Sequence, residues 1–83
     1  MAYNIRYKQT VKKDLARLDK REAKRVLDKI EKALSTRPNR YPALKGRFAG
    51  LRKMRMGDYR VIYAILGDDI LILRIGNRKE RYR

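Results

Sequence analysis

The chain has no cysteine, histidine or tryptophan, and only nine of its 83 residues are acidic. Without cysteine it can form no disulfide, thiolate nucleophile or zinc ribbon, and without histidine it has no Ser-His-Asp triad or imidazole acid–base pair. Its few carboxylates are too scattered for us to expect a metal site, and we expect no other cofactor. Any catalysis must therefore use lysine, arginine, tyrosine or a carboxylate.

Long apolar stretches are also missing from the sequence. Residues 1–8 lack the apolar stretch, about 7 to 15 residues long, of a signal peptide, and no run approaches the ~20 residues that span a membrane. The lack of cysteine is consistent with a reducing compartment. We therefore expect a cytoplasmic protein that does not associate with a membrane, with residues 1–83 forming a single domain.

Positive charge is what the chain has in excess, with 24 lysine and arginine residues and a formal net charge of +15. Residues 11–34 carry nine basic and five acidic residues, whereas residues 37–60 carry eight basic residues against Asp58 alone. A heat-adapted surface is one alternative, but that surface is rich in both signs of charge. The imbalance instead favours a polyanion or an acidic protein as a partner.

Hydrophobic periodicity predicts an α+β fold that begins with a short strand and two helices. Residues 3–7 alternate as in a half-buried strand. Thr10 is expected to cap a brief helix over residues 11–18. Asp19 and Glu22 resemble a capping box that starts a longer helix, which ends near Leu34.

Turn residues predict how the rest of the chain is organised. Both prolines and two glycines fall within residues 35–50, which predicts a loop. Glycine–aspartate turns then separate three apolar runs, which predicts an antiparallel meander over residues 51–56, 59–66 and 70–75. We expect the helical hairpin to pack on one face of this small antiparallel sheet and to leave the other face open. Tyr59 and Tyr63 alternate with Val61 and are expected to face the helices.

Strand alternation indicates which side chains share the open face. Lys53 and Arg55 point to the same side of their strand. In the last strand, strict alternation places a mixed set on one side: Ile70, Ile72, Arg74, Gly76 and Arg78. Lys53, Arg55, Arg60 and Arg78 can therefore converge as an anion site. Spacing alone fits equally well the ordinary polar side of a half-exposed sheet.

Three segments of the sequence resemble the RelE/ParE superfamily of toxins from toxin–antitoxin pairs. Residues 57–63 (GDYRVIY) resemble the characteristic hairpin of that family. Upstream, the leucine-lysine-glycine at 44–46 and the basic residues of 50–55 (GLRKMR) resemble its loop and second strand. Downstream, residues 76–82 (GNRKERY) resemble its closing segment. The resemblance covers essentially the whole chain and implies the same order of strands and helices.

The resemblance implies one of two activities. RelE members cleave messenger RNA in the ribosomal decoding site, and ParE members inhibit DNA gyrase with the same fold. RelE nucleases use basic residues of the second and third strands, with an arginine and a tyrosine near the C-terminus. The matching positions here are Lys53, Arg55, Arg60, Arg78 and Tyr82. This match favours an A-site endoribonuclease, or mRNA interferase, while a gyrase inhibitor and an inactive basic binding module remain alternatives.

Cleavage of RNA without a metal requires a base for the 2′-hydroxyl, stabilisation of the phosphorane and a proton for the 5′-oxygen. Arg60 and Arg78 are expected to hold the scissile phosphate through bidentate contacts. Lys53 is the candidate base, because neighbouring cations favour its neutral amine. Arg55 would stabilise the transition state or the leaving oxygen. Tyr82 would stack on a nucleobase or serve as the alternative base.

Basic residues around these positions are expected to contact RNA or the ribosome, and they are Lys45, Arg47, Arg52, Arg74, Lys79, Arg81 and Arg83. Arg52 neighbours Lys53, and a bulge would exchange which of the two faces the site. Asn77 stands where many relatives carry a histidine. The resemblance also implies a cognate antitoxin that wraps the toxin and covers the basic surface, and an acidic or amphipathic helix would suit the net charge.

Overall fold

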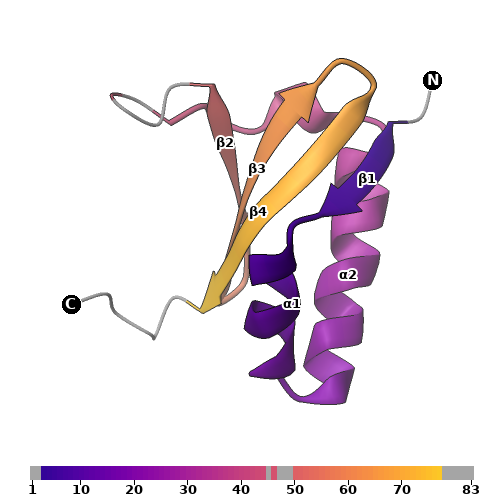
Figure 1. Ribbon diagram of the computed structural model, residues 1–83, viewed down its shortest axis with the longest axis vertical. Helices are drawn as coiled ribbons and strands as arrows, with labels where there is room; N and C mark the ends of the chain where they lie inside the picture. Colours follow the sequence, from indigo (N-terminus) through magenta and orange to yellow (C-terminus); the bar gives the residue numbers. More distant parts are fainter. Residues whose placement is uncertain (1–2, 45, 47–49, 78–83) are drawn as a thin grey trace.

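The computed structural model describes residues 3–44, 46 and 50–77. Figure 1 shows two helices beside a twisted four-stranded sheet. The elements are β1 (Asn4–Tyr7), α1 (Gln9–Ala16), α2 (Lys20–Leu34), the 3-10 helix η1 (Pro38–Arg40), β2 (Leu51–Met56), β3 (Tyr59–Leu66) and β4 (Asp69–Asn77). The expected α+β order is therefore confirmed. Within these residues, neither helix has both the length and the apolar character needed to cross a membrane.

The sheet is mixed, with the strand order β1-β4-β3-β2. The predicted meander is confirmed, because β2 with β3 and β3 with β4 are antiparallel pairs. β1 pairs with β4 in parallel, so the expectation of an antiparallel sheet is wrong for this strand. A parallel pair needs a long crossover, which both helices and two further strands provide here. Local turn signals cannot show this pairing, because β1 lies 65 residues before its partner in β4, as the Asn4–Asp69 contact shows.

Two tight turns set the register of the meander. Gly57 (φ +56°) and Gly67 (φ +63°) each occupy the first turn position after a strand, and no residue other than glycine has a positive φ among those described. A positive φ at the first position alone fits a type II′ turn, which matches the twist of the strands it joins. β2 consequently pairs with β3 along its whole length, from Leu51 opposite Ala64 to Met56 opposite Tyr59.

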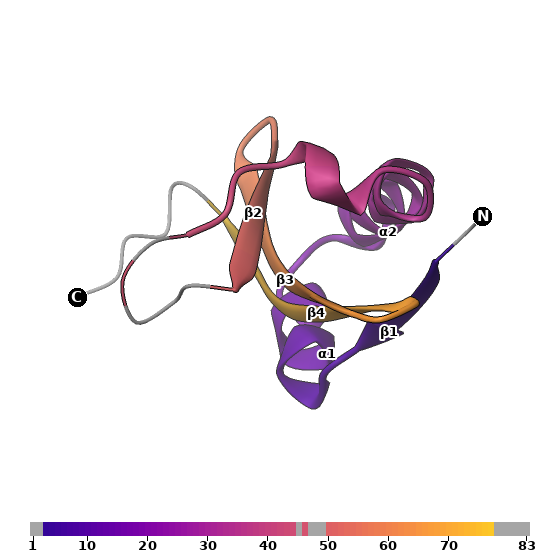
Figure 2. The ribbon, with the colours of Figure 1, turned by 90° about the horizontal axis from the view of Figure 1, so that it is seen from above.

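The core lies between α2 and one face of the sheet. Figure 2 shows α2 and η1 on the same side of the strands. The core cluster consists of the buried residues Val11, Val26, Ile30, Leu34, Met54, Val61, Tyr63, Ile70, Ile72 and Ile75. Tyr63 is fully buried, and its hydroxyl donates to the Pro38 carbonyl (2.5 Å), while Tyr59 packs against the edge of the core. The expectation that both tyrosines face the helices is confirmed.

The helix starts differ from the expected caps. α1 begins at Gln9 with Lys8 as its N-cap, so Thr10 lies inside the first turn, and its hydroxyl donates to the Leu73 carbonyl (2.9 Å). Asp19 is the N-cap of α2, but its side chain makes no capping hydrogen bond. The predicted capping box does not form, because the Glu22 carboxylate instead accepts a hydrogen bond from the Tyr59 hydroxyl (3.0 Å).

A bulge in β4 changes which of its side chains face the core. Ile62 pairs with Arg74 and Tyr63 pairs with Ile72, so Leu73 is an extra residue. Ile70 and Ile72 are buried together with Ile75, and their predicted place on the side of Arg74 is wrong. Strict alternation fails here because the extra residue inverts the side-chain period.

α1 continues the edge of the sheet beyond the end of β1, as Figure 1 shows. The Lys8 N–H donates to the Ile72 carbonyl (3.0 Å). Further along β4, the Thr10 hydroxyl donates to the Leu73 carbonyl, and the Ile75 N–H donates to the Asp14 carboxylate (2.9 Å). Side chains of α1 therefore form hydrogen bonds with backbone groups of β4 that would otherwise pair with a neighbouring strand. On the other edge, the loop before β2 adds an isolated bridge between Ala43 and Arg52.

Candidate nucleic-acid interface

Four cations lie in two neighbouring rows of the sheet. In the first row Arg55 of β2 lies opposite Arg60 of β3, which in turn lies opposite Gly76 of β4. In the second row Lys53 lies opposite Ile62, which lies opposite Arg74. Cβ atoms of residues directly opposite are about 4.5–5.5 Å apart. The set Lys53, Arg55, Arg60 and Arg74 is called the basic face.

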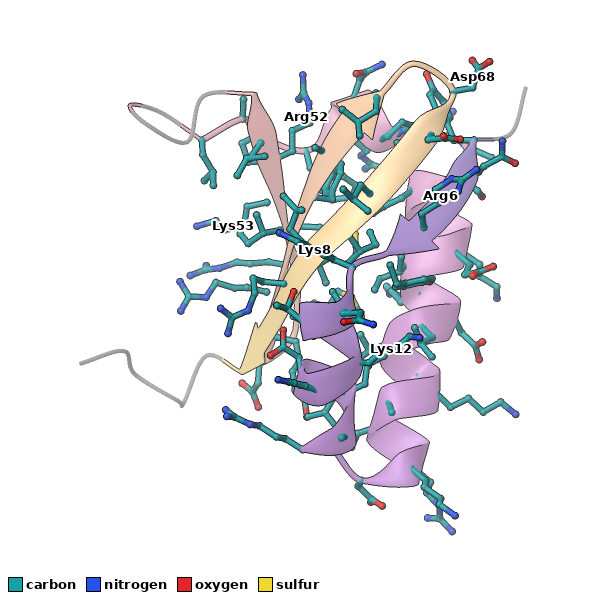
Figure 3. All side chains as sticks on the ribbon, viewed as in Figure 1. Arg6, Lys8, Lys12, Arg52, Lys53 and Asp68 are labelled. Carbon is teal, nitrogen blue, oxygen red and sulfur yellow. The ribbon has the colours of Figure 1, made fainter. Side chains whose placement is uncertain are left out.

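The basic face points away from the core. Its neighbours along the three strands, Met54, Val61 and Ile75, are buried on the helix side. Lys53 and Arg60 are half-buried and Arg55 is exposed. Figure 3 shows Lys53 projecting from the sheet away from both helices. The Arg55–Arg60 pair places two positive charges directly opposite each other on this face, and guanidinium groups can bind the oxygens of an anion.

A shallow groove of about 300 Å³ adjoins the basic face. Its lining is largely apolar beside two arginines and comprises Leu44, Leu51, Arg60, Ile62, Leu73, Arg74 and Gly76. Gly76 has no side chain, which leaves room beside Arg60. An apolar floor with guanidinium groups at its side can take a nucleobase and its phosphate, or an amphipathic acidic peptide.

A carboxylate from α1 positions Arg74. Asp14 Oδ2 accepts from Arg74 Nε (3.1 Å) and from the Ile75 N–H (2.9 Å). The Asp14 side chain is only 9% exposed, whereas that of Arg74 is 55% exposed. Asp14 is not among the site residues predicted from the sequence. A signal was present, because Asp14 lies three residues after Val11 on the apolar side of a short helix, where a carboxylate needs a partner.

Arg52 faces the helix side of the sheet. β2 pairs with β3 without a bulge, so Lys53 keeps its place on the basic face and no exchange with Arg52 occurs. The Arg52 Nη1 donates to the carbonyls of Tyr41 (2.5 Å) and Asn39 (3.2 Å). The structure therefore places Arg52 apart from the other predicted RNA contacts, as a tie between β2 and the segment that follows η1.

The remaining predicted site residues lie outside the part of the chain that the structure describes. They are Lys45, Arg47, Arg78, Lys79, Arg81, Tyr82 and Arg83. The structure thus brings together Lys53, Arg55, Arg60 and Arg74, and the roles expected of Arg78 and Tyr82 stay predictions.

Three tyrosines are held as neutral phenols on the helix side of the molecule. Burial raises the pKa of Tyr63 to about 12, with the Arg52 charge opposing the shift and Tyr41 adding to it. Burial, followed by the hydrogen bond and charge of Glu22, raises the pKa of Tyr59. Burial and the adjacent Glu31 carboxylate raise the pKa of Tyr7 far above its usual range. None of the three therefore suits proton abstraction near neutral pH. No cluster of three potential metal ligands occurs among the described side chains.

Comparisons with known proteins agree with this arrangement. A family profile described as "ParE toxin of type II toxin-antitoxin system, parDE" matches residues 5–82. Toxin RelG of Mycobacterium tuberculosis is 34% identical over 88 residues, covering 100% of this chain and 99% of that protein. The toxin–antitoxin complex RelBE2 of the same organism contains a chain that is 30% identical, with a TM-score of 0.90 over 96% of this chain and 95% of its own. A chain of the archaeal RelE–RelB complex from Pyrococcus horikoshii is 31% identical, with a TM-score of 0.68 over 98% and 100%.

Proposed function

Because the chain belongs to the RelE/ParE family of toxins of type II toxin–antitoxin systems, we propose that it cleaves messenger RNA in the ribosomal A site and thereby inhibits translation. The observation that supports this most directly is the basic face, where strand register places Lys53 beside Arg55 and Arg60 on an open surface. A nuclease that works without a metal needs such a group of cations, because charge builds up on the phosphorane in the transition state.

The proposed reaction is an attack by the 2′-hydroxyl oxygen on the adjacent phosphorus. The new O2′–P bond forms as the P–O5′ bond breaks, which leaves a 2′,3′-cyclic phosphate and a 5′-hydroxyl. Lys53, as the neutral amine, takes the 2′-proton, and Tyr82 is the alternative base. Arg60 and Arg78 hold the non-bridging oxygens through planar guanidinium groups. Arg55 stabilises the charge on the leaving 5′-oxygen, which takes a proton from water to give the 5′-hydroxyl.

The ribosome would supply the orientation of the RNA. The basic face offers charge and an apolar groove rather than a set of donors and acceptors that reads bases. We therefore expect weak cleavage of free RNA. In this proposal, Arg74 holds the RNA backbone from its fixed position beside Asp14.

A cognate antitoxin is the second proposed partner, because two of the related structures are complexes of a toxin with its antitoxin. The groove beside the basic face suits an amphipathic acidic segment, with its apolar side on Leu51 and Ile62 and its carboxylates near Arg60. Such a segment would cover the residues proposed to bind RNA, and so would inhibit cleavage.

Inhibition of DNA gyrase is the alternative function, and the match to the ParE profile favours it. The two functions require different targets, so one set of assays separates them. A gyrase inhibitor blocks supercoiling in vitro and produces no new RNA ends. A ribosome-dependent nuclease produces new RNA ends and leaves supercoiling unaffected.

The test of the nuclease is a cell-free translation reaction with and without ribosomes, in which new messenger RNA ends are mapped. Lys53→Ala and Arg60→Ala should each lower cleavage by about a hundredfold or more. Lys53→Arg keeps the charge but removes the base, so it should cleave as poorly as Lys53→Ala. Lys12→Ala, on the exposed surface of α1, is the control and should cleave normally. Wild-type rates for both alanine variants would contradict these roles.

A further inference from the structure

A second group of cations lies on the helix side of the sheet, where α2 ends. It lines a groove of about 370 Å³, here called the α2 groove, formed by Lys29, Lys32, Ala33, Thr36, Arg37, Arg40 and Tyr41. Four of these seven residues are basic and none is acidic. Figure 2 shows η1, which carries Arg40, close to the end of α2. The α2 groove shares no residue with the basic face.

The cations of the α2 groove are exposed, and none of them has an ionic partner among the residues that the structure describes. Within the part of the chain that the structure describes, the ion pairs involve Arg6 and Arg74 rather than any cation of this groove. Lys32 lies in the last turn of α2, where a positive charge interacts favourably with the C-terminal end of the helix dipole, so its presence there has a structural reason. The helix dipole does not account for Arg40, which lies in η1 beyond the helix.

Hydrogen bonds from the sheet hold in place the side of the groove formed by residues 38–41. Arg52 donates to the carbonyls of Asn39 and Tyr41, and Tyr63 donates to the carbonyl of Pro38. Both donors belong to strands of the sheet, so residues 38–41 are tied to a rigid support. A fixed segment presents Arg40 at a lower entropic cost of binding than a mobile loop would.

The excess of positive charge in the groove does not continue towards the start of α2. The neighbouring pocket, of about 500 Å³, lies towards the start of the helix and is lined by Glu22 and Asp58 as well as Arg25. Lys29 lines both pockets. An anion is therefore drawn more strongly to the α2 groove, which has four cations and no carboxylate in its lining, than to the neighbouring pocket, where two carboxylates balance Arg25 and Lys29.

The lining of the groove favours a phosphate backbone over a protein helix as the anion. An amphipathic helix needs an apolar seat, and the α2 groove offers only Ala33 and the ring of Tyr41. The groove beside the basic face, by contrast, has four aliphatic residues. We propose that the α2 groove binds the phosphodiester backbone of RNA, as a second site on the side of the sheet opposite the basic face. The choice of RNA rests on the proposed function.

The test compares two double variants of equal charge. Lys32→Gln/Arg40→Gln removes two cations of the groove, and Arg21→Gln/Lys24→Gln removes two exposed cations of the first turns of α2. Fluorescence anisotropy with a labelled oligouridylate of about 20 nucleotides, over about 50 to 200 mM KCl, gives the affinity and its salt dependence. The groove variant should bind about tenfold or more weaker, and its salt slope should fall by about 1.4, which is about 0.7 for each of two phosphate contacts. The control should change less than about threefold.

Equal losses in the two variants would overturn the proposal, because they would show an effect of net charge alone. Anisotropy with labelled polyglutamate tests the other class of partner. If the groove variant loses polyglutamate binding but keeps RNA binding, the groove serves an acidic protein and the proposal is wrong. The binding assay does not depend on cleavage. A negative result would therefore contradict RNA binding at the α2 groove without contradicting ribosome-dependent cleavage, and the loss of cleavage would not contradict RNA binding.

Discussion

Asp14 joins α1 to β4 through one carboxylate oxygen, and its replacement by alanine should lower the free energy of unfolding by about 2 kcal/mol. Asp14 Oδ2 accepts the Ile75 N–H at 2.9 Å from a side chain that is 9% exposed. Loss of this acceptor leaves a part-buried strand N–H unpaired, which costs about 1–3 kcal/mol. The ion pair with Arg74 adds little, since Arg74 is 55% exposed and such pairs contribute about 0–1 kcal/mol.

Urea unfolding followed by circular dichroism measures this effect. In thermal unfolding, the melting temperature of Asp14→Ala should fall by about 8–16 °C, because 1 kcal/mol corresponds to about 4–8 °C in a domain of this size. Asp14→Asn keeps an acceptor oxygen for the Ile75 N–H and should lose less than half as much stability. Asp28→Ala, on the exposed surface of α2, serves as the control.

Most of the effect of Asp14→Ala is expected from the unpaired strand N–H rather than from the lost ion pair. Arg74→Ala should therefore cost no more than about 1 kcal/mol. If the free energy of unfolding of Asp14→Ala were within about 0.5 kcal/mol of the wild-type value, the role given to the hydrogen bond from the Ile75 N–H would be refuted. An Arg74→Ala variant as unstable as Asp14→Ala would refute it as well.

Two further predictions concern residues on the helix side of the sheet. Tyr63 has a folded-state pKa of about 12 against about 10 in an unfolded chain, so the unfolded chain loses its proton first as the pH rises. The stability that the neutral phenol provides is fully present below pH about 10 and is lost as the pH rises through about 12. Urea unfolding at alkaline pH should show this decline in the wild type and less of it in Tyr63→Phe; equal declines would contradict the assignment. Arg52→Met removes the donor to the carbonyls of Asn39 and Tyr41 and should cost about 1–2 kcal/mol in urea unfolding, whereas the exposed control Arg55→Met should change stability by less than about 0.5 kcal/mol.

The helices and strands could be predicted because their signals are local. β2 and β3 fall at the predicted residues, since a glycine–aspartate turn fixes the register of a two-residue hairpin. The parallel place of β1 and the extra residue Leu73 could not be predicted. No proline or glycine marks that bulge, and the pairing of β1 depends on contacts across most of the chain.

The same distinction applies to the candidate site. Alternation on two well-registered strands is enough to group Lys53, Arg55 and Arg60. Asp14 and Arg52 act through contacts with segments distant in sequence, and only the folded chain shows them. Sequence chemistry thus identified the cations, and tertiary structure separates those of the basic face from Arg52, which braces the fold.

The edge strands of the sheet are the four-residue β1 and the six-residue β2. β1 and α1 occupy the outer side of β4, where Asp14 takes the Ile75 N–H. On the opposite edge, the Leu44 N–H donates to the Leu51 carbonyl (2.8 Å) and the Lys53 N–H to the Pro42 carbonyl (3.1 Å). In the part of the chain that the structure describes, these contacts leave only residues 54–56 of β2 for an incoming strand, with the charged Arg55 at their centre. So short and charged an edge disfavours sheet-to-sheet aggregation.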